Sequence, residues 1–149
     1  MPRKTEVPTG FGYRPFTLAD ARAFAISDRV ARGSRFRRVF RGVYIRSDVL
    51  DTPRLRFDAA RRISEGDIWA TCHTAAALYD VPVPEQPDTH IALPPGFTRP
   101  RGRGLVSHRH NTQPDTVSVR GRRLATPEDT FVQLAAYLNL VDLVRSGAA

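Results

Sequence analysis

Residues 36–46 read FRRVFRGVYIR, and this stretch decides the fold of the first third of the chain. Apolar side chains at strand spacing mark residues 36–40 and again residues 43–45. The dipeptide Arg41-Gly42 lies between the two runs and is typical of a tight turn. The stretch therefore predicts a β-hairpin that is rich in arginine.

Two short helices are predicted immediately before this hairpin. Thr17-Leu-Ala-Asp20 is a capping box with Asp in place of Glu, and apolar side chains then recur at helical spacing. Ser27 can cap a second helix over residues 28–32, which Gly33 closes. The predicted order is therefore a helix, a turn, a short basic helix and a basic hairpin. This is the order of elements in a winged helix-turn-helix. The usual first helix of that unit is missing or reduced here.

The remaining sequence predicts a small mixed α/β body over residues 51–145. Helices are expected at 51–65, at 73–79 and from Thr126 onwards, with a shorter segment at 140–144; strands are expected at 68–71, 89–93, 105–109 and 116–119. Residues 1–13 are rich in Pro and Gly, which predicts a flexible arm before a DNA-binding unit over 14–46. The expected fold class is α+β, with a reduced winged helix-turn-helix before the body.

Charge is distributed unevenly along the chain. Residues 1–46 hold eleven Lys/Arg against three Asp/Glu, a net charge of +8, whereas residues 47–149 hold twelve of each. Such a basic segment favours a polyanionic partner, here double-stranded DNA, over a solvated face that only keeps the protein soluble. The candidates for contact with DNA are Arg29, Arg32, Arg35, Arg37, Arg38 and Arg41.

A second arginine-rich stretch lies in the loop before residue 105. It reads FTRPRGRG and contributes Arg101 and Arg103 as further DNA-binding candidates, because arginine-rich segments lie along nucleic-acid backbones. A surface loop with no nucleic-acid partner has the same composition, so both interpretations stay open.

The single Cys72 excludes an internal disulfide and a multi-cysteine zinc site, and its apolar surroundings predict a buried, inert thiol. His108 and His110 share one face of a predicted strand, which is half of a metal site. No carboxylate pattern completes that half-site, so we expect a polar surface stripe and no bound metal. The sequence has no secretory signal and no long apolar run, so we expect a cytoplasmic protein without a membrane partner.

Catalytic motifs are missing. Magnesium-dependent nucleases use an Asp followed by an Asp or Glu close to a Lys, but Lys4 is the only lysine in this chain. The sequence also lacks a phosphate loop, a dinucleotide fingerprint and a nucleophile elbow. We therefore expect neither an enzyme nor a cofactor.

Several runs resemble those of a large actinobacterial group of proteins. Two of them are Arg41-Gly-Val-Tyr44 and His73-Thr-Ala-Ala76, followed by Val81-Pro-Val-Pro84 and His90-Ile-Ala-Leu-Pro-Pro-Gly96. Over about residues 15–145 the order of these runs resembles the AbiEi antitoxin family of type IV toxin–antitoxin systems.

The resemblance implies a winged helix-turn-helix followed by an α/β body, and an antitoxin-like transcriptional regulator that binds an operator. A palindromic operator implies a homodimer. The resemblance also implies a cognate nucleotidyltransferase toxin, related by genetic linkage rather than by direct contact. Two alternatives stay open. One is the recognition half of a truncated or split very-short-patch-repair-like DNA endonuclease, and the other is a protein-binding module that restrains a toxin or host factor.

Overall fold

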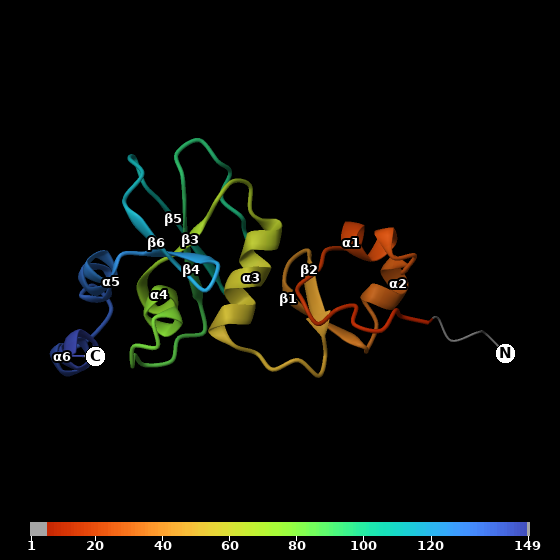
Figure 1. The fold of residues 1–149 in the computed structure, drawn as a ribbon, viewed down its shortest axis with the longest axis horizontal. Helices are drawn as coiled ribbons and strands as arrows, with labels where there is room; N and C mark the ends of the chain where they lie inside the picture. Colours follow the sequence, from red (N-terminus) through yellow and green to blue (C-terminus); the bar gives the residue numbers. More distant parts are fainter. Residues whose placement is uncertain (1–5, 149) are drawn as a thin grey trace. The chain divides into compact units, whose positions relative to one another are not determined.

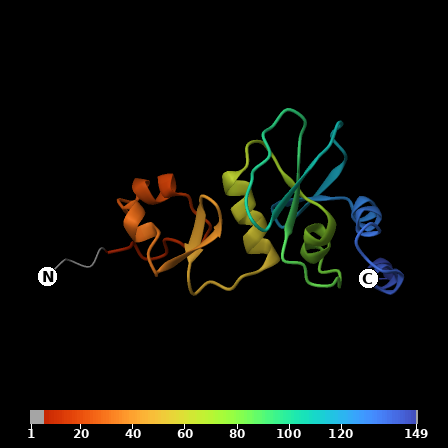
Figure 2. The same cartoon turned by 180° about the vertical axis from the view of Figure 1, so that it is seen from behind.

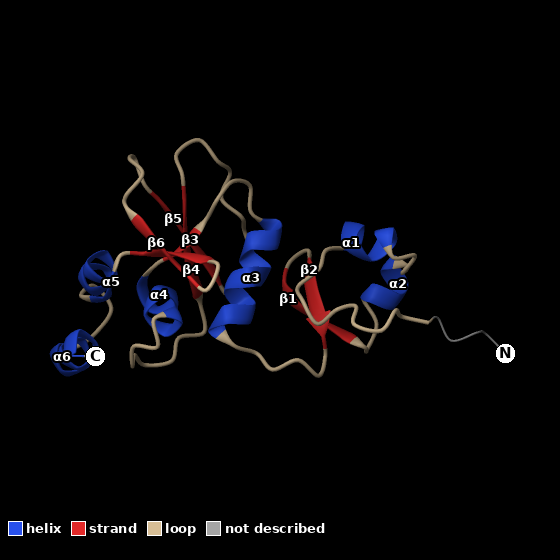
Figure 3. Cartoon of the chain, in the orientation of Figure 1, coloured by secondary structure: helices blue, strands red, loops and turns tan. Residues whose placement is uncertain are grey.

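The computed structural model describes residues 6–148, which form six helices and seven strands (Figures 1 and 3). The strands make one two-stranded and one five-stranded sheet, which confirms the predicted α+β class. The chain divides after Ile63 into two compact units, residues 1–63 and residues 64–149. The predicted helix at 51–65 therefore belongs to the first unit, although the sequence placed it in the body.

Helices α1 (Leu18–Ala23) and α2 (Asp28–Ala31) open the first unit. The capping box is confirmed: the Asp20 amide donates to the Thr17 hydroxyl at 3.2 Å, and the Thr17 amide donates to the Asp20 carboxylate at 2.8 Å. Ser27 caps α2 in the same way by accepting from the amide of residue 30. The caps fix where both helices begin, because they satisfy amides that have no partner within the helix.

The predicted hairpin follows as strands β1 (Phe36–Phe40) and β2 (Val43–Arg46). The strands are antiparallel, and Phe40 pairs with Val43, so Arg41-Gly42 forms a two-residue turn as expected. Gly42 has φ +87°, a conformation that a side chain would strain. The hairpin prediction is therefore confirmed, including the position of its turn.

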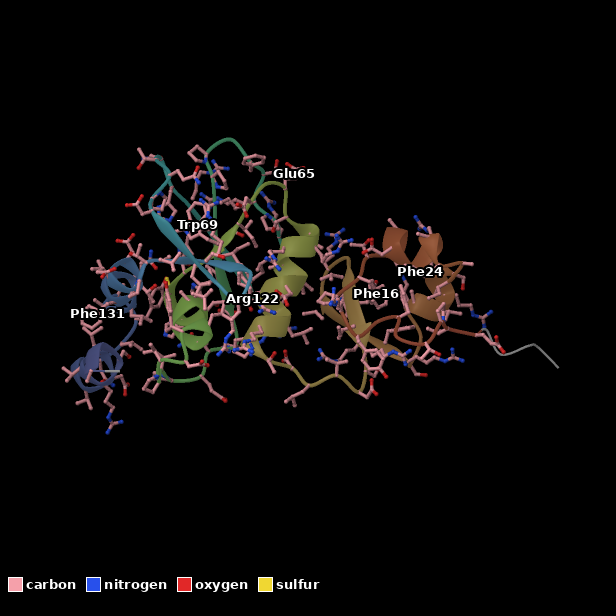
Figure 4. All side chains as sticks on the ribbon, in the orientation of Figure 1. Phe16, Phe24, Glu65, Trp69, Arg122 and Phe131 are labelled. Carbon is pink, nitrogen blue, oxygen red and sulfur yellow. The ribbon has the colours of Figure 1, made fainter. Side chains whose placement is uncertain are left out.

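One face of the hairpin packs against the two short helices. Phe36 from β1 meets Phe16 edge to face at 5.0 Å between ring centroids, and the fully buried Ala21 and Ala31 complete this core (Phe16 is labelled in Figure 4). Phe11 packs 4.7 Å from Phe16. Val7 and Phe11, predicted as part of a flexible arm, therefore pack against the core, because burial of apolar side chains outweighs the Gly and Pro content of this segment. Residues 1–5 of that predicted arm lie outside the described residues.

Helix α3 (Pro53–Ile63) covers the hairpin as well, since it contacts both β1 and β2. Val43 and Ile45 are fully buried, and strand alternation places them opposite the face that carries Tyr44. An ion pair between Arg62 and Asp20 links α3 to the start of α1. The hairpin is thus enclosed by helices on both of its faces.

The second unit is built on a mixed sheet with the strand order β5-β4-β3-β7-β6. Its strands are β3 (Trp69–Ala70), β4 (Thr89–Leu93), β5 (Leu105–Arg109), β6 (Thr116–Val119) and β7 (Arg122–Ala125). The central strand β3 runs antiparallel to β4 and parallel to β7, while β5 runs parallel to β4. The sequence did not predict β7.

Three helices accompany this sheet: α4 (Cys72–Leu78), α5 (Pro127–Leu134) and α6 (Leu140–Ala148). Helix α4 packs against β4 and β7, and α5 packs against α4, as Figures 1 and 2 show. Helix α6 extends beyond the segment 140–144 that the sequence predicted. Among the described residues, no helix has the length and apolarity needed to cross a membrane.

Candidate functional sites

The six N-terminal arginine candidates all lie in the first unit, on α2, on β1 and in the turns beside them. Four of them are exposed, and we name these four the arginine set: Arg29, Arg32, Arg38 and Arg41. Arg29 and Arg32 are three positions apart, a helical spacing that places them on the same side of α2. The other two lie on β1 and in the hairpin turn.

The remaining two candidates are engaged within the protein. The Arg37 guanidinium donates to the backbone carbonyl of Val49 at 2.9 Å, which ties the chain after the hairpin to β1. Arg35 is half-buried and also interacts within the protein. Both side chains therefore have a structural role, and the arginine set is the more accessible part of the predicted surface.

The acidic residues of the first unit are largely occupied by other arginines. Asp28 accepts two hydrogen bonds from Arg22 at 2.8 and 2.6 Å, and these bonds lower the pKa of Asp28. Arg56, Arg61 and Arg62 make ion pairs with further carboxylates, Asp51, Asp58 and Asp20 respectively. Within the described chain, no member of the arginine set makes such an ion pair; Arg32 acts on Asp28 only at longer range.

The difference in net charge between the two parts of the chain is larger when the chain is divided at the boundary between its units. Residues 1–63 carry fifteen Lys/Arg and six Asp/Glu, a net charge of +9. Residues 64–149 carry eight and nine, a net charge of −1. The arginines of α3 account for the increase over the value for residues 1–46, and sequence reasoning had assigned that helix to the neutral body.

Arg101 and Arg103 lie in the second unit, in the loop between β4 and β5, and both are exposed. Arg101 lines a shallow groove of about 1110 Å³ together with Arg99, Arg109 and His110. The loop therefore presents a second basic surface, on a different unit from the arginine set.

A compact cluster of histidine and cysteine lies elsewhere in the second unit. His90 from β4 and His108 from β5 stack with 5.3 Å between ring centroids, and His90 Nδ1 lies 3.0 Å from His108 Nε2. The Cys72 sulfur, at the start of α4, completes a group whose three ligand atoms all lie within 4.8 Å of one another. We name this group the Cys-His-His cluster.

The cluster is shielded by two further rings. His73 and Tyr137 pack on His90 with ring centroids 5.7 and 5.5 Å away. His73 is 3% exposed, and neither of its ring nitrogens has a hydrogen-bond partner in the described structure. Tyr137 is 50% exposed and forms the outer wall.

The backbone at Cys72 is held in an unusual conformation. Cys72 has φ +51°, a value that costs free energy for a residue with a side chain, and it lies at the junction of β3 and α4. Its amide donates to the Gln133 side chain from α5 at 3.1 Å. The main chain of His90 donates to the Thr74 hydroxyl at 2.8 Å, which fixes β4 against the first turn of α4.

Burial controls the protonation of the cluster. Burial, and then the neighbouring His108 and His73, lower the pKa of His90 to about 4. Burial is also the main cause that lowers the pKa of His73 and of His108. Burial raises the pKa of the Cys72 thiol. At neutral pH the three imidazoles are therefore uncharged and the thiol keeps its proton.

Of the two sequence-based predictions for these residues, one is confirmed and one needs correction. Cys72 is a buried thiol as expected, but His108 does not belong to an exposed polar stripe with His110. His108 instead packs on His90, because β4 and β5 pair in parallel with Ala92 opposite His108. The parallel pairing of β4 and β5 brings the two histidines together and the start of α4 adds Cys72, so no local sequence spacing signals the cluster.

Comparison with known proteins adds no assignment, because neither a protein-family model nor a curated protein sequence matches this chain.

Proposed function

We propose that the chain is a DNA-binding, antitoxin-like transcriptional regulator, and that its first unit acts as a reduced winged helix-turn-helix. The observation that carries this proposal is the separation of charge: a net +9 on residues 1–63 against −1 on the rest. Phosphate contacts supply most of the affinity of a protein for DNA, and a unit of this charge meets that requirement.

The order of elements supports the assignment to a helix-turn-helix. Helices α1 and α2 are separated by four residues, and the β1–β2 hairpin follows α2 directly. In this proposal α2 is the recognition helix, so Arg29 and Arg32 contact base edges or phosphates of the major groove. Arg38 and Arg41 on the hairpin contact the phosphate backbone as a wing does.

The regulatory part of the proposal rests on the resemblance to the AbiEi family. It places the binding site in the upstream region of the protein's own operon, beside a gene for a nucleotidyltransferase toxin. A palindromic site there requires two copies of the chain, one for each half-site.

The test is the binding of the full chain to labelled duplexes, measured by fluorescence anisotropy at several salt concentrations. One duplex carries the upstream intergenic sequence, and a second carries the same bases in scrambled order. We expect tighter binding to the upstream duplex, and an affinity that falls steeply with salt. Arg38→Gln and Arg41→Gln should each reduce the slope of log affinity against log salt by about 0.9, whereas Arg29→Gln and Arg32→Gln should weaken binding and reduce the preference for the upstream duplex.

The matched control is Arg145→Gln, an exposed arginine on α6 in the second unit. It removes the same charge, so a general effect of net charge would weaken binding as much as the four test variants do. Equal losses in all five variants would refute the proposed surface. Equal affinity for the upstream and scrambled duplexes would refute the role as a regulator.

A further inference from the structure

The Cys-His-His cluster offers three donor atoms that three separate elements hold together. Cys72 begins α4, His90 lies in β4 and His108 in β5, and the sheet register and the α4 contacts position all three. We propose that Cys72, His90 and His108 form a binding site for a divalent transition-metal ion of the zinc class. This site lies in the second unit and does not depend on the proposed DNA-binding function.

The chemistry of the donors determines the class of ion. One sulfur and two imidazole nitrogens form the borderline-soft set that suits zinc, whereas magnesium and calcium require oxygen ligands. With Zn–N bonds of about 2.0–2.1 Å and a Zn–S bond of about 2.3 Å, tetrahedral ligand atoms lie roughly 3.3–3.6 Å apart. The three atoms already lie within 4.8 Å of one another, so small side-chain rotations bring them to that spacing.

The surroundings hold the three donors in place before any ion arrives. The positive φ at Cys72 sets the direction in which its side chain leaves the backbone, and the bond from its amide to Gln133 holds that turn. The amide of His90 is bonded to Thr74, and the parallel pairing of Ala92 with His108 sets the register of the two histidine strands. Such support of the ligating residues is typical of metal sites.

The three side chains can each offer one donor atom to an ion. A neutral imidazole has one ring nitrogen with a free lone pair, so His90 and His108 can each supply one nitrogen. Cysteine ligates a metal as the thiolate, so an ion that binds at Cys72 displaces the thiol proton. One proton is then released to solvent when the sulfur–metal bond forms.

Three protein ligands leave one tetrahedral position for a fourth group. His73 lies 5.7 Å from His90 between ring centroids, and its two ring nitrogens, buried and without partners among the described residues, remain available for an ion or for a water bound to it. An orphaned buried ring of this kind costs free energy unless something satisfies it. Tyr137, which is 50% exposed, packs edge to face on His73 with ring centroids 5.4 Å apart.

The competing explanation needs no ion. A neutral His90 and a neutral His108 can share one N–H···N hydrogen bond across the 3.0 Å between their nitrogens. That bond accounts for the two histidines but leaves the nearby sulfur and His73 without a role. The two explanations differ in whether the protein binds an added metal ion at these side chains.

The experiment is a titration of the full, chelator-treated protein with Co²⁺, a spectroscopic substitute for zinc, followed by displacement with Zn²⁺. We expect one equivalent of cobalt per chain, visible d–d bands of tetrahedral intensity, and a sulfur-to-cobalt charge-transfer band in the near ultraviolet. Zinc should remove all these bands. The charge-transfer band identifies Cys72 directly, because the sequence holds no other cysteine.

Two variants and a control assign the ligands. Cys72→Ser should abolish the charge-transfer band, and His108→Gln should weaken cobalt binding by more than the roughly 10–100-fold that loss of a supporting hydrogen bond costs. His110→Gln is the matched control, because it removes an imidazole two positions along from His108 and outside the cluster. It should leave both the spectrum and the affinity unchanged.

Circular dichroism of each variant without metal separates loss of a ligand from loss of the fold. If Cys72→Ser does not fold, the comparison of His108→Gln with His110→Gln decides the question. The absence of tetrahedral cobalt bands in the wild type would overturn the proposal and leave the histidine hydrogen bond as the explanation. Equal weakening by His108→Gln and His110→Gln would overturn it as well.

Discussion

Thr17 and Asp20 show how two side chains can define the start of a helix. Each bonds the backbone amide of the other, at 3.2 and 2.8 Å, and Asp20 also pairs with Arg62 on α3. The capping box therefore does more than begin α1, because it anchors that helix to α3. Its contribution to the first unit can be measured directly.

We predict that Thr17→Ala destabilises the first unit by about 1 kcal/mol, the usual cost of losing an N-cap side chain. The half-buried amide of Asp20 then loses its side-chain acceptor, while the rest of the core is unchanged. Urea unfolding, followed by the circular dichroism of the first unit's helices, provides the measurement. Thr17→Ser keeps the acceptor and should retain most of the stability; a loss as large as that of Thr17→Ala would contradict this account.

Asp20 also makes the first unit sensitive to acid. Burial alone would raise the pKa of Asp20, but the bonds from the Thr17 amide and from Arg62 outweigh it, so the pKa is lowered. A carboxyl whose folded pKa is depressed stabilises the protein above its unfolded pKa of about 3.9, and this stability is lost as the pH falls through the folded value.

We therefore predict that Asp20→Asn lowers stability at pH 7 and that the difference from wild type shrinks as the pH falls below about 4. Urea unfolding over this pH range tests the trend. Asp48→Asn is the control, because Asp48 is exposed after the hairpin and makes no ion pair within residues 6–148. A difference from wild type that persisted in acid would exclude the proposed role of the Asp20 charge.

The residue scale also shows where sequence reasoning ends. The caps at Thr17 and Ser27 could be predicted, because each depends on residues only three positions away. The Cys-His-His cluster could not, since His90 and His108 meet only through the parallel register of β4 and β5. His110 is closer to His108 in the sequence than His90 is, so the sequence suggested His108 and His110 as a pair. Strand alternation places residues two apart on the same face, but it does not bring their ring nitrogens together.

At the scale of elements, a polar contact joins α4 and α5, which otherwise pack through apolar side chains. The Gln133 side chain from α5 accepts the amide of Cys72, which no α-helical bond satisfies at the start of α4. The strained turn between β3 and α4 thus depends on a helix that follows much later in the sequence.

We predict that Gln133→Met destabilises the second unit by about 1–3 kcal/mol, the cost of a buried amide left without an acceptor. Gln133→Glu keeps an acceptor oxygen and should lose less. The measurement is denaturant unfolding monitored by the fluorescence of Trp69, which lies on the central strand (Figure 4). Val132→Ala, 70% exposed on the same helix, is the control and should change stability little.

The elements that could be predicted from the sequence are those stabilised by contacts between residues close together in the chain. The β1–β2 hairpin is defined by its own alternation and by Gly42 in its turn, so the sequence located it correctly. Strand β7 was missed because it begins with two arginines and pairs in parallel with the distant β3. Helix α3 was predicted as a helix, but its packing on the hairpin, and hence its unit, depends on contacts that periodicity does not describe.

At the scale of the whole molecule, the two proposals assign different ligands to different units. The first unit carries all of the surplus positive charge, and the second carries the Cys-His-His cluster. A ligand stabilises the part of the protein that binds it, by about 2.7 kcal/mol at one hundred times its dissociation constant. Each ligand should therefore protect its own unit.

We predict that duplex DNA slows amide hydrogen exchange in α2, β1 and β2, whereas Zn²⁺ slows it in β4, β5 and the first turn of α4. Mass-spectrometric exchange of the full chain with each ligand in turn provides the measurement. Protection by DNA confined to the second unit would contradict the proposed regulator and leave the metal site intact. Protection by zinc confined to the first unit would contradict the proposed metal site and leave the proposed regulator intact.

The sheet order of the second unit sets an order of events during synthesis. The first unit consists of neighbours in the sequence and is complete at Ile63, so it can form as soon as that residue has left the ribosome. Strand β3 emerges next, but α4, β4, β5 and β6 are all made before its parallel partner β7. Until then the backbone groups of β3 on that side have no strand partner, and we expect the nascent chain to be most prone to aggregation in this interval.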